Sequence, residues 1–96
     1  MLNIIWTDLA IEDVSDNIEY LENEWSENEV VRFNVKIHQV LDQLSKGTIE
    51  CNPTEYDDIF KIVIIKQITL FYKIDKDNIV LLRFWNTYQH PNKLRF

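Results

Sequence analysis

The stretch IFKIVIIKQITLFYKIDKDNIVLLRFW, residues 59–85, decides the fold of this chain. It is rich in isoleucine, valine and aromatic residues, and its apolar positions recur with a period of about two, which is typical of β-strands. The turn sequence DKDN at 75–78 separates the last two apolar runs. We therefore predict three short strands, at 59–65, 69–74 and 79–85, which pair in succession as an antiparallel meander.

The residues before this stretch follow a helical period. After a short apolar run at 2–6, which we expect to be a strand, Thr7 is a suitable N-cap for a helix over about 8–25. The apolar face of that helix is Ile11, Val14, Ile18, Leu21 and Trp25. Ser26 and Glu29 predict a capping box for a second helix, and Gly47, the only glycine, is expected to end it.

Two amphipathic helices with almost no loop between them must fold back as a hairpin, and their apolar faces need a third surface. The order β-α-α-β-β-β therefore predicts an α+β fold, in which a small antiparallel-rich sheet packs against an α-helical hairpin. A chain of 96 residues is long enough for one hydrophobic core, so we expect residues 1–96 to form a single domain.

Composition excludes several kinds of site and location. The first ten residues lack the features of a signal peptide, and the longest apolar runs are too short to cross a bilayer. A lone Cys51 cannot form an internal disulfide, which suits the reducing environment of the cytoplasm. No membrane partner is expected. His38 and His90 are isolated, so no metal site is expected, and a single glycine excludes a glycine-rich phosphate loop. No cofactor is expected.

The net charge of −6 hides an asymmetry along the chain. Residues 1–31 hold nine acidic residues and no lysine or arginine, whereas residues 59–96 hold seven basic residues and two acidic ones. Such polarity indicates charged partners, although a solvated acidic helix face beside ordinary strand lysines explains it equally well.

Strand alternation predicts which side chains face the helices and which face away. The helix-facing set is Phe60, Ile62, Ile64, Leu70, Tyr72, Ile74, Val80, Leu82 and Phe84. The outward set is Lys61, Val63, Ile65, Thr69, Phe71, Lys73, Leu81, Arg83 and Trp85. The outward face thus mixes cations with apolar groups, and the basic, aromatic tail RFWNTYQHPNKLRF at 83–96 continues it. A sheet face of this kind usually needs a partner, and simple packing of Trp85 and Phe96 is the alternative.

The same region contains the only residues with catalytic potential. Cations stabilise phosphate groups, and histidine or tyrosine can transfer a proton, as metal-free RNA cleavage requires. The weak catalytic candidates are Lys61, Arg83, Tyr88 and His90. Any sheet edge with a polar tail could supply such a set, so these residues leave open whether the chain is an enzyme.

Three segments resemble the RelE/ParE toxins of bacterial toxin–antitoxin systems. They are IIWTDLAIEDVSDNIEYL near the start, LFYKID with the following NIVLLRFW, and the closing NTYQHPNKL, and the resemblance spans essentially the whole chain. It implies a small sheet packed against a helical hairpin, in agreement with the fold predicted above. It also implies the toxin of a type II toxin–antitoxin, or plasmid stabilisation, system with a cognate antitoxin as partner. A homodimer is among the assemblies that the resemblance allows.

Members of this family either inhibit DNA gyrase, as in the ParE branch, or cut mRNA in the ribosome, as in the RelE branch. This chain has Thr69 and Tyr88 at positions where family members often have arginine, and it is acidic, whereas the nucleases are typically basic. These departures favour a ParE-like toxin that binds a protein target such as DNA gyrase. The alternatives are a ribosome-dependent mRNA endoribonuclease and an interaction module that has lost its toxicity.

The resemblance also implies an acidic antitoxin segment that wraps its toxin. Such a segment would suit the cations and apolar groups of the outward face and tail. The expected partner-binding residues are Lys61, Phe71, Lys73, Leu81, Arg83, Trp85, Lys93 and Arg95.

Overall fold

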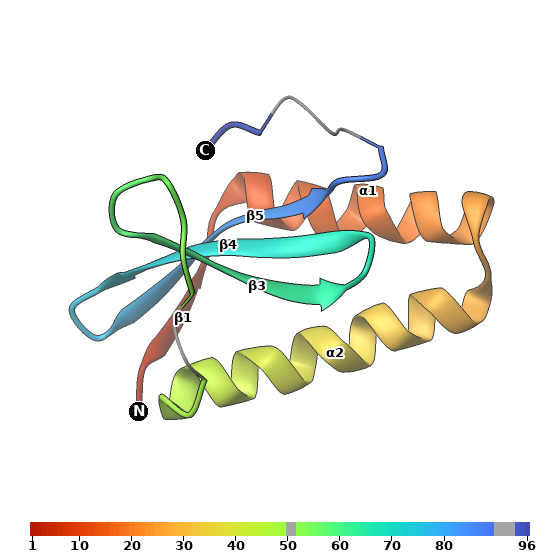
Figure 1. The fold of residues 1–96 in the computed structure, drawn as a ribbon. Coiled ribbons are helices and arrows are strands. Elements are labelled where there is room, and N and C mark those ends of the chain that lie inside the picture. Colours follow the sequence, from red (N-terminus) through yellow and green to blue (C-terminus); the bar gives the residue numbers. More distant parts are fainter. Residues whose placement is uncertain (50–51, 90–93) are drawn as a thin grey trace.

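Figure 1 shows the computed structural model, which describes residues 1–49, 52–89 and 94–96. The elements are β1 (Asn3–Trp6), α1 (Asp8–Glu24), α2 (Glu27–Lys46), β2 (Asn52–Pro53), β3 (Ile59–Ile65), β4 (Ile68–Asp75) and β5 (Asn78–Asn86). The strands form one sheet in the order β1-β5-β4-β3-β2. Strand β1 runs parallel to β5, and the other neighbours are antiparallel. The predicted α+β fold and its antiparallel meander are confirmed, and the short strand β2 is an addition that the sequence pattern did not indicate.

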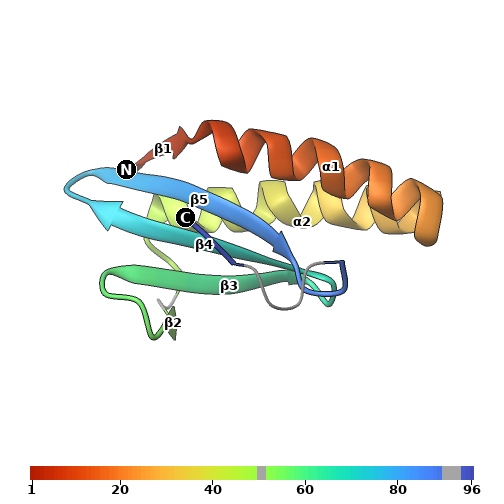
Figure 2. The ribbon, with the colours of Figure 1, turned by 90° about the horizontal axis from the view of Figure 1, so that it is seen from above.

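Both helices lie on one face of the sheet (Figure 2), with α1 against β5 and α2 against β3. The core fills the space between these layers. Its largest side chains are Phe33 from α2, Tyr72 from β4 and Phe84 from β5, each almost completely buried. None of the helices within the described ranges is long and apolar enough to cross a membrane.

Thr7 joins the start of α1 to the sheet. Its hydroxyl accepts a hydrogen bond from the backbone N–H of Ala10, as an N-cap residue should, and donates one of 2.7 Å to the carbonyl of Leu81 in β5. The predicted cap is confirmed, and it also ties the helix to the sheet at the point where β1 ends.

We expect Thr7→Ala to lower the free energy of unfolding by about 1–2 kcal/mol, because both hydrogen bonds of the hydroxyl are lost. Urea denaturation measures the change. Thr7→Ser keeps the hydroxyl and should lie within about 0.5 kcal/mol of wild type. Equal losses in both variants would show that the methyl group, and not the hydroxyl, stabilises this junction.

The ends of α2 follow the prediction at one terminus only. Gly47 adopts a left-handed conformation with φ of 70° and ends the helix, as expected. The predicted capping box is wrong, because the side chain of Ser26 makes no capping hydrogen bond. Glu29 instead pairs with Arg32 at 3.1 Å and accepts a hydrogen bond of 3.4 Å from Gln67, which draws its carboxylate away from the helix N-terminus.

Strand β5 contains a β-bulge that interrupts its alternation. Tyr72 of β4 pairs with Leu81, whereas its neighbour Phe71 pairs with Arg83. Leu82 is therefore an extra residue on β5, and every side chain on one side of it is shifted to the opposite face.

The bulge overturns part of the face assignment. Leu81 is completely buried in the core, so the prediction that it faces outward and binds a partner is wrong. Val80 and Leu82, predicted to face the helices, are only half-buried and lie outside the core. Ile65 is also a core residue, not an outward one, because the pairing of β3 with β4 is irregular between Val63 and Ile65.

Helix α1 buries a face offset from the predicted one. Ala10, Asn17 and Leu21 are its buried residues, whereas Ile11, placed on the apolar face by the sequence pattern, is 54% exposed. The buried set includes the polar Asn17, so the buried face of α1 does more than cover the core. The contacts of Asn17 with β5 explain its burial.

Candidate functional site

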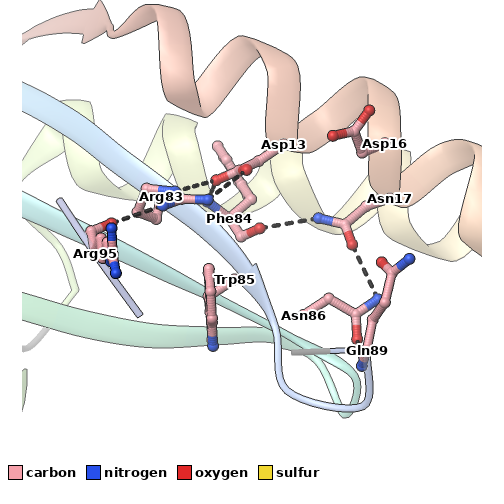
Figure 3. Close-up of a pocket in the computed structure, with 9 residues that line it drawn as sticks. All are labelled: Asp13, Asp16, Asn17, Arg83, Phe84, Trp85, Asn86, Gln89 and Arg95. Carbon is pink, nitrogen blue, oxygen red and sulfur yellow. Dashed lines mark hydrogen bonds and ion pairs between the residues drawn. The ribbon is translucent and has the colours of Figure 1, made fainter. Parts of the chain in front are cut away.

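Polar side chains of α1 complete the hydrogen bonding of strand β5 beyond the end of β1. Strand β1 pairs with β5 only as far as Leu81. Further along, the backbone N–H of Phe84 donates to Asp13 at 3.1 Å, and the carbonyl of Phe84 accepts from the side-chain amide of Asn17 at 2.9 Å (Figure 3). Asp13 and Asn17 are one helical turn apart, so they can reach the donor and the acceptor of one residue. The helix thereby takes the place of a neighbouring strand.

The same carboxylate holds Arg83. Its Nε and Nη2 atoms donate to the two oxygens of Asp13 at 2.6 and 2.9 Å, a bidentate pair in which both side chains are 13% exposed. Its Nη1 atom donates to the carbonyl of Arg95 at 2.7 Å, and its guanidinium lies 4.9 Å from the ring centre of Trp85. The hydrogen bonds to Asp13 raise the pKa of Arg83 above its ordinary value. All three guanidinium nitrogens of Arg83 are thus engaged within the chain.

These contacts surround a small polar cleft of about 270 Å³ between α1 and the end of β5 (Figure 3). Asp16 and Gln89 line its open side, and Asn86 lies at its base, where it donates to Asn17 at 3.0 Å. Asp13, Asn17, Arg83 and Asn86 bind one another or the backbone of Phe84, so this part of the cleft serves the packing of α1 on β5. In the described ranges, no group of three or more histidine, cysteine, aspartate or glutamate residues could hold a metal ion.

The outer face of the sheet is partly covered by the described end of the tail. Phe96 packs edge-on against Phe71 of β4 and Tyr56 of the β2–β3 loop, with ring centres 5.5 and 5.0 Å apart. Phe71, which this ring covers, is only 9% exposed, and Trp85, beside the Arg83 guanidinium, is only 7% exposed. The expectation that they form an open apolar surface is therefore wrong.

The lysines of this face that the structure describes remain accessible. Lys61 of β3 lies opposite Phe71 in the register and lines a hollow of about 350 Å³ together with Tyr56 and Leu94. Lys73 lies farther along β4 and is exposed. We call Lys61, Phe71, Lys73, Arg95 and Phe96 the outer-face cluster.

The structure does not bring the catalytic candidates together. Arg83 is bound by Asp13, and Lys61 lies in the hollow near β2. Tyr88 lies after β5, where its ring contacts Trp25 at the turn between the helices at 5.9 Å. His90 and Lys93 fall outside the described residues. Among the residues described, no pair of acid and base faces a shared phosphate site.

A family model provides the decisive comparison. The model for the ParE toxin of the type II toxin–antitoxin system parDE matches residues 4–91. The chain belongs to the ParE toxin family. No curated protein matches it at a significant level.

Solved structures share the ParE fold at low identity. A chain from the chromosomal ParDE toxin–antitoxin system of P. aeruginosa aligns with a TM-score of 0.72 and 13% identity, covering 90% of this chain and 96% of that one. A metal-bound toxin from Helicobacter pylori gives 0.65 and 14%, covering 94% and 99%. The YoeB dimer from Staphylococcus aureus gives 0.59 and 17%, covering 86% and 93%. These likenesses establish the fold, and with the family match they confirm the predicted membership of the RelE/ParE superfamily.

Two positions at which ParE relatives were expected to carry arginine have packing roles here. Thr69 pairs with Trp85 across β4 and β5. Tyr88 contributes to an aromatic group at the hairpin turn, where Trp25 donates to the Tyr20 hydroxyl at 3.2 Å and Lys66 lies 4.5 Å from the Trp25 ring centre. Nothing in the local sequence indicated this group, because its members come from α1, the β3–β4 turn and the segment after β5.

Proposed function

We propose that this type II toxin acts by binding a protein target, with DNA gyrase as the target that the resemblance implies. The observation that carries the proposal is the state of Arg83. A cation that stabilises a phosphate needs accessible charge and donors, but three of the five N–H donors of Arg83 bind Asp13 or Arg95, and the Asp13 carboxylate offsets its positive charge. The remaining described candidates, Lys61 and Tyr88, belong to different parts of the surface.

We propose an antitoxin as the second partner. Structures with this fold include the YoeB–YefM toxin–antitoxin complex from Staphylococcus aureus and the DinJ–YafQ complex from E. coli. The outer-face cluster presents Lys61, Lys73 and aromatic groups, and an acidic antitoxin segment would complement them. Such a segment would have to displace or pack beside Phe96, whose ring covers Phe71. A homodimer, by analogy with the YoeB dimer, is a further candidate assembly. We place these interactions in the cytoplasm, where the targets of both branches are located.

Expression in a bacterial host without an antitoxin tests the proposal. We expect growth to stop and a DNA-damage reporter to be induced, because inhibited gyrase leaves broken DNA. Ribosome-dependent cleavage, the alternative, would instead give mRNA cuts at codons in the ribosomal A site. Normal growth at high expression would contradict both and favour a non-toxic interaction module.

The toxicity of the variant Tyr88→Phe distinguishes a binding mechanism from a catalytic one. If the Tyr88 hydroxyl transfers a proton, its loss should reduce activity by about 100-fold or more, a typical contribution of general acid–base catalysis. On the binding mechanism, toxicity should be unchanged, because the ring that contacts Trp25 remains. Dose–response curves of growth against inducer measure the difference, and immunoblotting controls for expression.

A further inference from the structure

The C-terminal half of helix α1 concentrates negative charge. Glu19, Glu22 and Glu24 lie there, and the last turn of the helix holds no basic residue. Carboxylates are unfavourable at this end, because the helix dipole already makes it negative. Within the described ranges, none of the three forms an ion pair. The stability of the fold therefore does not explain this charge, which suits a cation from outside the chain.

Two of these carboxylates line a polar groove between α1 and the segment after β5. The groove has a volume of about 260 Å³, and its described lining is Asp16, Glu19, Tyr20, Asn23 and Glu24 of α1, with Gln89 on the other side. The spacing of three and four residues places the α1 side chains on one face of the helix. No basic side chain is among these described residues, and Asp16 makes none of the contacts marked in Figure 3. The groove thus offers three carboxylates to a ligand.

An aromatic group borders the groove at Tyr20. The indole nitrogen of Trp25 donates to the Tyr20 hydroxyl at 3.2 Å, and the ring centre of Tyr88 lies 5.9 Å from that of Trp25. Trp25 and Tyr88 remain 38% and 54% exposed. The Trp25 ring already contacts one cation, since Lys66 Nζ lies 4.5 Å from its centre. Aromatic faces next to carboxylates suit a guanidinium group, which stacks on rings and pairs with carboxylates in its own plane.

We propose that this groove binds an extended, arginine-rich segment of a partner protein. The carboxylates would pair with its guanidinium groups, and one of these groups would stack on the exposed rings of Trp25 and Tyr88. The helix face from Asp16 to Glu24 is about 12 Å long, a distance that about four residues of an extended chain span. The proposal does not depend on which target the toxin inhibits, and an acidic antitoxin segment would be repelled from this surface.

Binding of short peptides to the full chain tests this proposal. The probe is a blocked peptide of about six residues that alternates arginine and serine, a length that covers the groove. We expect it to bind, to shift the amide NMR signals of Glu19–Glu24 and Gln89, and to bind less tightly as salt is added. The lysine counterpart should bind at least about threefold more weakly, because an ammonium group cannot form a bidentate pair with a carboxylate. The glutamate counterpart should not bind.

Matched variants control for the general acidity of the chain. Glu19→Gln combined with Glu24→Gln should weaken binding of the arginine peptide about tenfold or more, because both carboxylates line the groove. Glu22→Gln combined with Glu27→Gln removes the same charge at exposed positions outside the groove and should weaken binding less than about twofold.

Several results would overturn the proposal. They are no binding at millimolar peptide, equal losses in the two double variants, and equal binding of the arginine and lysine peptides. Spermine that binds as tightly as the arginine peptide would overturn it in favour of a small polyamine. A salt-sensitive dimer of the free chain that Glu19→Gln with Glu24→Gln dissociates would overturn it in favour of self-association.

Discussion

Phe33→Ala is expected to lower the free energy of unfolding by about 3–5 kcal/mol, the usual loss when a buried phenylalanine is truncated. Phe33 is completely buried on α2, and its ring packs edge-on against Phe84 of β5 at 6.4 Å between ring centres. The variant therefore leaves a cavity where the helical hairpin meets the sheet. Since domains of this size are stable by about 5–15 kcal/mol, the change could remove most of the margin.

Urea denaturation followed by circular dichroism measures this effect. Val35→Ala is the matched control, because Val35 lies on the same helix but is half exposed, and its loss should stay within about 0.5 kcal/mol. A loss below about 1 kcal/mol for Phe33→Ala would contradict the packing of α2 over the end of β5.

Asp13→Ala should produce the second large effect, a loss of roughly 2–4 kcal/mol. Removal of one partner from a buried ion pair costs about 3–5 kcal/mol, and this pair retains 13% exposure on each side. Arg83 would keep its charge without a carboxylate, and the N–H of Phe84 would lose its acceptor. Asp16→Ala makes the same charge change on the exposed face of α1 and should cost less than about 0.5 kcal/mol.

A double-mutant cycle identifies the cause of that loss. Asp13→Ala combined with Arg83→Met removes both charges, so the double variant should be less destabilised than the sum of the two single variants by about 1–3 kcal/mol. Additive losses would show that Asp13 stabilises the fold mainly through the backbone of Phe84 and not through Arg83.

Local sequence patterns were sufficient to predict both helices, every strand except the short β2, and the order of these elements. Period-two runs gave strands β3, β4 and β5, and the helical stripes gave the hairpin, because both periods follow directly from backbone geometry. The prediction of which β5 side chains face the helices failed at Leu82. This extra residue in the strand places Leu81 on the face opposite to the one predicted. A bulge of this kind depends on how two strands pair, so a single run of apolar residues carries little sign of it.

The site was predicted less well, since its contacts join residues far apart in the sequence. Asp13 binds Arg83 across 70 positions, and both residues separately resembled ordinary surface charges. From the sequence pattern we therefore expected Arg83 to bind a partner or a phosphate, whereas in the fold it binds Asp13 of α1. The tail illustrates the same limit, because the placement of Phe96 on Phe71 depends on the complete sheet.

We propose that this ParE-family chain inhibits a protein target and does not cut RNA. DNA supercoiling by purified gyrase, measured with increasing amounts of the purified chain, tests it most directly. We expect supercoiling to be lost as the chain reaches excess over gyrase. If the outer-face cluster forms the contact, Lys61→Glu combined with Lys73→Glu should shift the required concentration about tenfold or more. Full supercoiling at large excess, together with mRNA cleavage when the same preparation is added to translating ribosomes, would contradict it.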